Sequence, residues 1–158
     1  MIRFAIITVS DTRTPADDAA GPRLVSLAGE LGPVVERSLV TDDFERIRER
    51  LLELCKREDV DVILTTGGTG FGPRDNTPEA TLSIIERAAP GLAEAMRRET
   101  AEATPFAMLS RAVCGIAARK LIINLPGSPK GVEECFAVIR PVLAHAVAML
   151  RGEGHNEN

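Results

Sequence analysis

Short apolar runs alternate with segments of helical spacing along the whole chain. A short apolar run bounded by polar residues predicts a buried strand, and apolar residues at every third or fourth position predict a helix. The apolar runs predict strands at 2–9, 34–40, 60–66 and 120–125. The helical segments lie at 22–31, 78–87, 90–102 and 131–150, with one more that begins near Asp42. This alternation is typical of βαβ units and predicts one α/β domain with a mostly parallel sheet.

Two of these helices show a clear apolar face. Asp42 is the predicted N-cap of the second helix. The inner face of that helix would consist of Phe44, Ile47, Leu51 and Leu54 or Cys55. The last helix has a longer stripe at helical spacing, made of Val132, Phe136, Ile139, Leu143, Val147 and Leu150. Pro141 should kink it because proline lacks the backbone donor. Residues 105–113 fit either a short strand or an irregular segment.

The stretch Thr65–Glu79 carries the strongest functional signal. It follows a predicted strand and leads into a helix, with Thr77 as the predicted N-cap and Pro78 at the first helical position. The loop between them is rich in glycine, which permits positive φ and close approach of a ligand to the main chain. Successive backbone N–H groups in such a loop can form a concave anion site. We therefore expect it to hold a phosphate, with Asp75 acting on that phosphate or holding a metal ion.

Polar residues also follow the other predicted strands. Ser10-Asp11 follows the first strand, Asp42 the second, and the run 124–128 ends the strand at 120–125. Because ligands bind at the carboxyl ends of parallel strands, we expect these loops to converge on one small-molecule site. Asp42 and Asp75 together would supply the carboxylates that Mg²⁺ coordination requires beside a phosphate.

The composition narrows the class of partner. The chain of 158 residues has a net charge of −4, no Trp, no Tyr and five Phe. It therefore offers neither the basic surface nor the stacking side chains expected for nucleic-acid binding. No apolar run approaches the length of a membrane span, and the N-terminus does not resemble a signal segment. The three widely spaced cysteines fit no zinc or disulfide pattern, so we expect reduced thiols in a cytoplasmic protein.

Several candidate residues also have a purely structural interpretation. Asp42 could simply cap a helix, and Asp75 could simply complement a helix dipole. Arg111 could bind an anionic ligand or form an ordinary polar pair with its neighbour in a loop. Asp17 and Asp18, in the loop after the first strand, could add a further ligand contact.

A Ser-His-Asp hydrolase is the least favoured alternative. It would combine Ser10 or Ser110 with His145, but neither serine stands in a nucleophile-elbow sequence. His145 lies in the last helix, where we expect it to pack beside the apolar stripe.

Several separate motifs occur in one consistent order along the chain. They are Thr8–Asp11, Gly21-Pro22, Thr65–Gly70, Pro73-Arg74-Asp75, Thr77–Thr81, Met108–Arg111, Ile122–Ser128 and Glu134–Phe136. Together they resemble the molybdenum cofactor biosynthesis family, which includes Mog, MoaB and the G domain of gephyrin and its plant counterpart. The resemblance covers nearly the whole chain.

The resemblance implies a single three-layer αβα domain over residues 1–152, a flexible tail at 153–158, and assembly as a homotrimer or hexamer. It also implies a reaction, in which the terminal phosphate of molybdopterin attacks the α-phosphate of ATP and pyrophosphate leaves. By this resemblance, Asp42 and Asp75 are the catalytic residues and the Mg²⁺ ligands. The implied substrate-binding residues are Ser10, Asp11, Gly67, Gly68, Thr69, Gly70, Ser110, Asn124, Pro126, Gly127 and Ser128.

One departure and one alternative accompany this expectation. Asn76 stands where family members usually carry an apolar residue, which would alter the hydrogen bonds of the loop but leaves Asp75 in place. The alternative is a non-catalytic, MoaB-type protein that binds molybdopterin in the same pathway. The intact runs 73–75 and 124–127 are closer to the Mog and gephyrin branch, so we expect a molybdopterin adenylyltransferase. Its partners would be ATP, molybdopterin and other proteins of the pathway.

Overall fold

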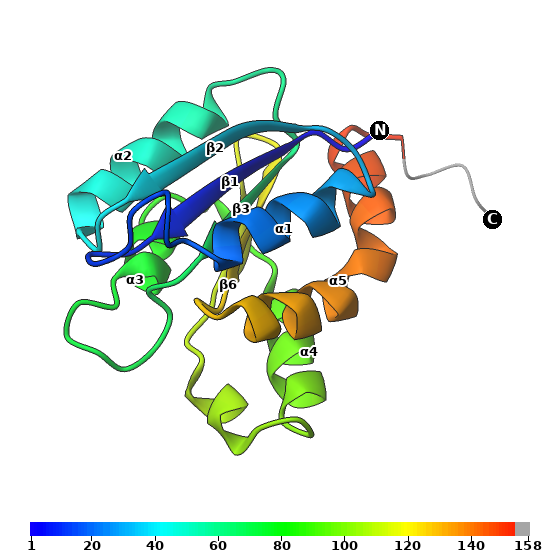
Figure 1. Ribbon diagram of the computed structural model, residues 1–158. Helices are drawn as coiled ribbons and strands as arrows, with labels where there is room; N and C mark the ends of the chain where they lie inside the picture. The colour runs from blue at the N-terminus through cyan, green and yellow to red at the C-terminus, as the bar shows by residue number, and fades with distance from the viewer. Residues whose placement is uncertain (154–158) are drawn as a thin grey trace.

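The alternating segments form one six-stranded sheet with helices on both faces (Figure 1). The computed structural model describes residues 1–153; residues 154–158 of the predicted tail lie outside the described residues. In chain order the elements are β1 (Phe4–Val9), α1 (Ala20–Gly29), β2 (Val34–Val40), α2 (Phe44–Cys55), β3 (Val62–Thr66), α3 (Thr77–Leu82), β4 (Arg87–Ala88), α4 (Pro90–Thr100), the 3₁₀ helix η1 (Pro105–Leu109), β5 (Cys114–Ala117), β6 (Lys120–Leu125) and α5 (Pro129–Leu150). No helix within residues 1–153 is both long and apolar enough to cross a bilayer.

The strand order creates a reversal between β1 and β3. The order is β2-β1-β3-β6-β5-β4, and the first four strands are parallel to one another. Strand β5 is antiparallel to β6, and β4 is antiparallel to β5. The chain first adds β2 on one side of β1 and then β3 on the other side. Such a switch point is where parallel sheets form a ligand crevice. The loops that follow β1, β2, β3 and β6 therefore lie together at the carboxyl ends of the parallel strands. These loops are residues 10–19, 41–43, 67–76 and 126–128.

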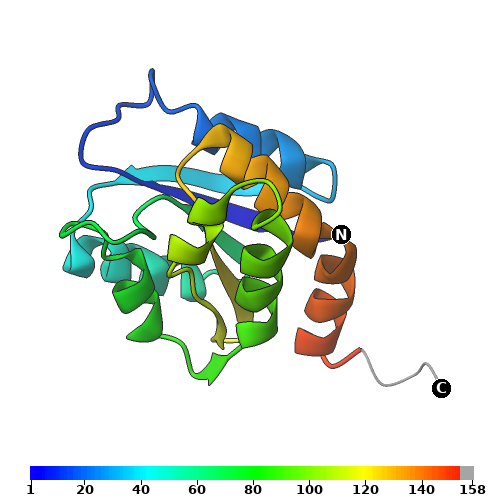
Figure 2. The same cartoon turned by 90° about the horizontal axis from the view of Figure 1, so that it is seen from below.

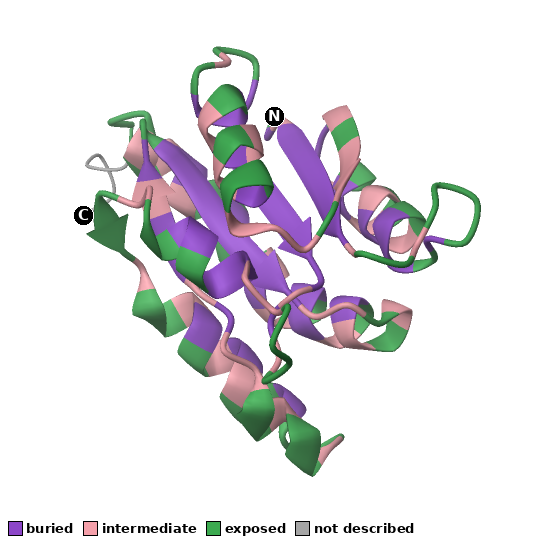
Figure 3. Cartoon of the chain, turned by 90° about the vertical axis from the view of Figure 1, so that its left-hand side faces the viewer, coloured by how far each residue is buried: buried purple, intermediate pink, exposed green. Residues whose placement is uncertain are grey.

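Three layers are built around this sheet. Helices α1, α4 and α5 pack on one face, and α2 and α3 pack on the other (Figures 1 and 2). Each face of the sheet has its own hydrophobic core, because successive side chains of a strand point to opposite faces. Phe4 and Ile6 of β1 point into the core beneath α1, α4 and α5, and Ala5 and Ile7 point into the core beneath α2 and α3. The buried residues run through the sheet between the helices (Figure 3). The expected three-layer α/β fold is confirmed.

The apolar faces predicted for the second and last helices are confirmed, but the cap of α2 is not. Ile47, Leu51 and Leu54 are buried beneath α2, and the stripe of α5 is buried from Val132 to Val147. Asp43, not Asp42, is the N-cap of α2, and its side chain accepts a hydrogen bond from the N–H of Arg46 at 2.9 Å. The carboxylate of Asp42 is therefore free of the capping role that the sequence suggested.

Helix α3 is shorter than predicted. It covers Thr77–Leu82 rather than 78–87, because Arg87 and Ala88 pair with β5 as the edge strand β4. Thr77 is the first residue of the helix and not its N-cap. Its hydroxyl donates to the carbonyl of Gly67 at 2.9 Å, which anchors the helix to the glycine loop.

Helix α5 contains Pro141 and changes direction along its length (Figure 1). His145 is exposed, so the expectation that it packs beside the apolar stripe is wrong. It lies two positions from both Leu143 and Val147, which are buried. Residues two apart on a helix point to different sides, so His145 lies away from the buried stripe.

The antiparallel hairpin of β5 and β6 is not foreseen by the sequence pattern. Its two-residue turn consists of Ala118 and Arg119, whose φ values are 48° and 62°. Turns of this kind usually carry Gly, Asn or Asp, so the ordinary hairpin signal is missing here. Residues 105–113 form η1 and an irregular segment, not a strand.

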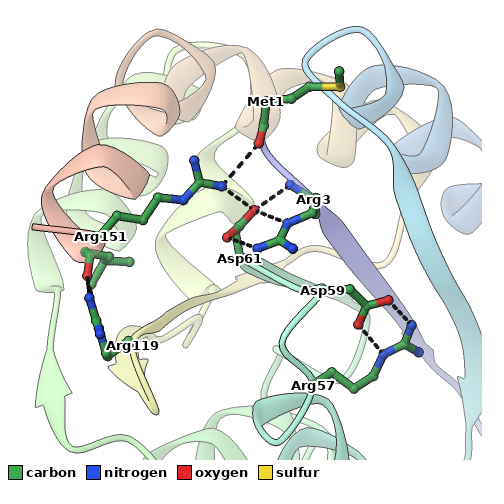
Figure 4. A network of polar contacts seen from close by, with 8 residues as sticks. Met1, Arg3, Arg57, Asp59, Asp61, Arg119 and Arg151 are labelled. Carbon is green, nitrogen blue, oxygen red and sulfur yellow. Dashed lines mark hydrogen bonds and ion pairs between the residues drawn. The ribbon is translucent and has the colours of Figure 1, made fainter. Parts of the chain in front are cut away.

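An ionic network lies at the opposite end of the sheet from these loops, where the parallel strands begin (Figure 4). The carboxylate of Asp61, only 9% exposed, pairs with Arg3 at 3.0 Å and with Arg151 at 2.8 Å. Arg151 also donates to the carbonyl of Met1 at 3.2 Å. Burial raises the pKa of Asp61, but the hydrogen bonds from Arg3 and Arg151 outweigh burial and hold that pKa well below its usual range. The network fixes the starts of β1 and β3 to the end of α5.

We expect Asp61→Asn to lower the free energy of unfolding by about 1.5–3 kcal/mol at pH 7, because it removes a charged acceptor of several hydrogen bonds. The folded-state pKa of Asp61 is lowered, so this stabilisation is present above the unfolded-state pKa of about 3.9 and is lost as the pH falls below it. Urea unfolding at pH 7 and pH 3 measures both effects. The matched variant is Asp59→Asn, whose pair with Arg57 is exposed and should matter much less. Equal losses in the two variants would contradict the role of the network.

Candidate functional site

The glycine loop after β3 packs directly against the end of β1. Gly67 has a φ of 101°, and a β-carbon there would lie 2.3 Å from the carbonyl oxygen of Val9. Gly68 has a φ of 69°, and its β-carbon would lie 2.3 Å from the hydroxyl of Thr77. Residues with side chains rarely adopt these angles and could not fit in these spaces. The main chain itself therefore forms this wall of the site.

The loops after β1, β3 and β6 are joined to one another. Arg13 donates to the carbonyl of Gly127 at 2.9 Å, and Thr66 donates to the carbonyl of Pro126 at 2.6 Å. A β-carbon on Gly127 would lie 3.3 Å from the α-carbon of Gly67, so the two glycine turns are in close contact. The convergence of the three loops at the switch point follows the strand order.

Asp11 and Asp42 meet across the ends of β1 and β2. The N–H of Asp42 donates to the carboxylate of Asp11 at 3.0 Å, and the N–H of Asp11 donates to that of Asp42 at 2.8 Å. Arg74, from the glycine loop, binds both carboxylate oxygens of Asp11 at 2.8 and 3.0 Å. The hydrogen bonds from Arg74 lower the pKa of Asp11. Asp11 is therefore neutralised by an arginine, and Asp42 is not.

One oxygen of Asp42 is left without a partner. Among residues 1–153, its Oδ1 is the single buried side-chain oxygen or nitrogen that makes no hydrogen bond. This oxygen faces the glycine loop, 3.1 Å from where a β-carbon of Gly68 would lie. Burial raises the pKa of Asp42, and the negative charges of Asp11 and Asp75 raise it further. An unpaired buried carboxylate oxygen is costly, and such groups concentrate at functional sites.

Asp75 lies on the other side of the same loop. Its carboxylate accepts a hydrogen bond from the N–H of Gly72 at 2.8 Å, and its own N–H donates to the carbonyl of Gly72 at 3.0 Å. β-carbons on Gly70 or Gly72 would each come within 2.9 Å of its Oδ2. Asp75 is also close enough to influence the pKa of Asp42. The fold thus brings the two predicted catalytic carboxylates together around the glycine loop.

A cavity of about 360 Å³ opens beside the loop. Its walls come from α4, η1, the start of α5 and the glycine loop, and they include the apolar side chains of Met96, Phe106 and Leu109. The predicted site residues that line it are Thr69, Gly70, Ser110, Asn124, Pro126 and Ser128. An apolar pocket with a few polar groups at its rim is the usual form of a small-molecule site.

Three predicted serines keep a hydrogen-bond donor for a ligand. Ser10 accepts from the N–H of Arg13 at 3.1 Å, Ser110 from Ala112 at 3.3 Å, and Ser128 from Gly131 at 3.0 Å. Each hydroxyl is thus oriented by an acceptor role within its own turn. A serine hydroxyl has one donor besides its acceptor sites, so the O–H of each remains able to donate.

Asn124 has a structural role, although it borders the cavity. Its amide nitrogen donates to the hydroxyls of Thr65 and Thr81 at 3.0 Å each, and its amide oxygen accepts from the N–H of Val113 at 3.1 Å. Both amide hydrogens are used, and the residue is fully buried. Asn124 joins β6 to β3, α3 and the segment before β5, and it has no donor left for a ligand.

Asp18 also acts within the fold. Its buried carboxylate accepts from the hydroxyl of Thr8 at 2.7 Å, from the N–H of Gly21 at 2.9 Å and from Arg37 at 3.0 Å. Asp17 accepts hydrogen bonds from Thr14 within the same loop. These contacts shape the loop after β1, so the further ligand contact considered for this pair is not supported by their geometry.

Two arginines and an asparagine make long-range contacts that their local sequence does not predict. Arg74 binds Asp11, and Arg111 binds the backbone of the glycine loop and the carboxylate of Glu79. The amide of Asn76 donates to the carbonyl of Asp42 at 3.1 Å, so the departure at this position adds a link across the crevice. A sequence signal existed for both arginines, since each stands inside a polar loop next to a candidate residue.

Taken together, the strand order and the position of the loops place this protein in the class of α/β domains that bind a small ligand at the switch point of a parallel sheet. Residues 5–145 match the family model described as "Probable molybdopterin binding domain". The chain therefore belongs to the molybdenum cofactor biosynthesis family that shares this domain.

Named relatives and solved structures agree with this assignment. The chain is 45% identical to the molybdenum cofactor synthesis protein cinnamon of Drosophila melanogaster over 94% of its own length, but it spans only 26% of that protein. It is 34% identical to the molybdopterin adenylyltransferase of Helicobacter pylori strain J99, covering 96% of this chain and 89% of the relative. The crystal structure of the molybdopterin biosynthesis enzyme MoaB from Thermus thermophilus superposes with a TM-score of 0.88 at 44% identity, covering 96% of this chain and 98% of that one.

We expect Asp42→Asn to raise the free energy of unfolding at pH 7, because the folded state disfavours the ionised carboxylate. The folded-state pKa is raised, so the penalty exists only while Asp42 is ionised. The gain should therefore shrink as the pH falls through that pKa and vanish below about 3.9, the unfolded-state value. Urea unfolding at several pH values measures this difference.

The matched variant is Asp18→Asn, which changes a carboxylate whose pKa is lowered rather than raised in the folded state. Burial raises the pKa of Asp18, but the hydrogen bonds from Gly21, Thr8 and Arg37 outweigh burial and lower it. This variant should lose about 2 kcal/mol at pH 7. If both substitutions destabilised the protein alike, Asp42 would be an ordinary structural carboxylate.

Proposed function

We propose that the protein is a molybdopterin adenylyltransferase. An oxygen of the terminal phosphate of molybdopterin attacks the α-phosphorus of ATP, the bond between that phosphorus and the oxygen bridging to the β-phosphorus breaks, and pyrophosphate leaves with the electron pair. The observation that carries the proposal is the unpaired, buried Oδ1 of Asp42, which faces the glycine loop beside Asp75. The name of the Helicobacter pylori relative supports the choice of reaction.

The residues suit a reaction that depends on positioning two anions. No hydrogen bond within residues 1–153 uses the N–H groups of Gly68, Thr69 or Gly70, so these donors are available to phosphate oxygens. Ser110 and Ser128 would donate their hydroxyls to the part of molybdopterin that enters the cavity. Little covalent chemistry is asked of the protein, because phosphoryl transfer is accelerated mainly by alignment and by charge stabilisation.

The donor set fits Mg²⁺. Asp42 offers an oxygen with no other partner, and Asp75 keeps an oxygen beyond the one that Gly72 binds. Among residues 1–153 no three His, Cys, Asp or Glu side chains are grouped to hold a metal on their own. Mg²⁺ usually takes one or two carboxylates and completes its shell with water and substrate phosphates. When bound, it would neutralise the phosphate charge that would otherwise oppose attack.

We expect Asp75→Asn to lower pyrophosphate release from ATP at least about a hundredfold while the protein stays folded, because a metal ligand near the transferred phosphate is lost. The assay contains purified protein, Mg²⁺, ATP and molybdopterin, and circular dichroism checks the fold. Retained turnover in this variant would remove Asp75 from the catalytic role.

Asp43→Asn is the control for that experiment. Asp43 stands next to Asp42 in the sequence, but its carboxylate caps α2 by accepting a hydrogen bond from the N–H of Arg46. This variant should lose some stability and keep its turnover. If the wild-type protein bound molybdopterin but released no pyrophosphate, the alternative of a non-catalytic, MoaB-type pathway protein would replace the proposed activity.

We also propose that the protein works as a homotrimer, with residues 105–113 at the subunit interface. Phe106 and Met108 are 75% and 71% exposed, which is unusual for apolar side chains on one short helix. Light scattering at micromolar concentration should give three times the chain mass of 17.0 kDa. Met108→Asp should shift the protein toward the monomer, since it places a charge in an apolar contact. A monomeric wild-type protein would contradict the proposal.

We place the protein in the cytoplasm. Cys55, Cys114 and Cys135 are buried and unpaired, as expected for reduced thiols. Burial raises the pKa of Cys114 to about 12 and that of Cys135 to about 11, so neither forms a reactive thiolate at neutral pH.

A further inference from the structure

Arg111 binds the loop that carries Asp75 at three points and α3 at a fourth. Its N–H donates to the carbonyl of Thr69 at 2.8 Å, its Nε donates to the carbonyl of Gly70 at 2.7 Å, and its Nη2 donates to the carbonyl of Asp75 at 2.8 Å. Its Nη1 forms an ion pair with Glu79, in the first turn of α3. A guanidinium presents its donors in a rigid, planar fork, so one side chain fixes several points at once.

The loop has little packing of its own between these points. Residues 71–74 are all exposed, including the apolar ring of Phe71 at 69%. On the crevice side, the loop is tied by Arg74 to Asp11 and by Asn76 to the carbonyl of Asp42. On the cavity side, the side chain of Arg111 supplies the contact to the carbonyl of Asp75. The position of the Asp75 backbone therefore depends directly on this arginine.

The guanidinium uses three of its five N–H donors on the protein. Each of its three nitrogens makes one such contact, and Glu79 balances its charge. These contacts give Arg111 a structural role, and the sequence-based alternative that it binds an anionic ligand stays a prediction. In the structural role, the side chain acts on the reaction through the residues that it holds.

Arg111 also connects the loop to the cavity. It directly follows Ser110, which lines the cavity, and the carbonyls of Ser110 and Ala112 accept hydrogen bonds from Arg97 of α4 at 3.2 and 3.0 Å. A continuous set of contacts thus runs from α4 through residues 110–112 to the backbone of Asp75.

We propose that Arg111 is a positioning residue that holds the Asp75 loop in register with the cavity wall at Ser110. A ligand that contacts Ser110 and a ligand that contacts Asp75 would then be aligned through one side chain. The effect on turnover rests on the proposed adenylyltransferase function, whereas the effect on the loop does not. The two effects are therefore measured separately.

The first measurement is hydrogen–deuterium exchange in Arg111→Lys, which keeps the charge but loses the fork. Within residues 69–79, exchange at the hydrogen-bonded amides of Gly72, Asp75 and Thr77 should become several-fold faster, while the rest of the chain is unchanged. Arg140→Lys is the matched control. Its ion pair with Glu30 has side-chain exposures of 40% and 53%, against 33% and 47% for the pair of Arg111 and Glu79, but it lies between α5 and α1. Unchanged exchange in residues 69–79 of Arg111→Lys would overturn the proposal.

The second measurement is the kinetics of pyrophosphate release. In Arg111→Lys, kcat should fall about tenfold to a hundredfold, because a small misplacement of an aligned group has that effect, while KM for ATP and molybdopterin changes little. Arg140→Lys should keep both constants. A raised KM with an unchanged kcat would mean that Arg111 binds substrate and would overturn the positioning role. If the wild type released no pyrophosphate but exchange accelerated as expected, the adenylyltransferase proposal would fail and the structural role of Arg111 would stand.

Discussion

The close contact between the end of β1 and the glycine loop determines the geometry of the whole site. A β-carbon on Gly67 would lie 2.3 Å from the carbonyl of Val9, so only glycine allows the loop after β3 to reach the end of β1. That contact lets Gly68 face the carboxylate of Asp42 from the neighbouring strand end. It also brings the turn at Gly127 against Gly67. A side chain at Gly67 would force the ends of β1, β3 and β6 apart. The carboxylates of Asp42 and Asp75 could then no longer face the same loop.

Carboxylates at the two ends of the strands differ in whether the protein pairs them. At the end where the parallel strands begin, Asp61 pairs with Arg3 and Arg151, and its pKa is lowered. At the site, Asp42 is half-buried with one buried, unpaired oxygen, and its pKa is raised. Both carboxylates are costly to desolvate, but only Asp61 recovers that cost from protein partners. The Asp61 network therefore stabilises the end of the sheet where the parallel strands begin, while the end where they finish keeps one carboxylate oxygen without a partner.

The sequence predicts the parts of the fold that depend on local patterns. Two strands, at 34–40 and 120–125, are found at the predicted residues, and the buried faces of α2 and α5 follow from helical spacing. The β5–β6 hairpin could not be predicted, because Ala118 and Arg119 are atypical of its turn. At the site, the motifs locate the loops, but they do not separate Asn124, which is fully used by the fold, from Ser110, which is not. That distinction depends on long-range hydrogen bonds that no local pattern contains.

The arginines near the site are already paired with carboxylates, so an anion would have to bind to other groups. Arg74 is neutralised by Asp11, and Arg111 by Glu79, so neither presents free positive charge to a phosphate. The loop offers backbone N–H groups, and these must act beside the negative charges of Asp42 and Asp75. A nucleoside triphosphate that entered without a cation would be repelled by both carboxylates. Cations that accompany the phosphates would remove this repulsion and also satisfy the unpaired oxygen of Asp42, so ligand binding and the relief of that buried charge would be the same event.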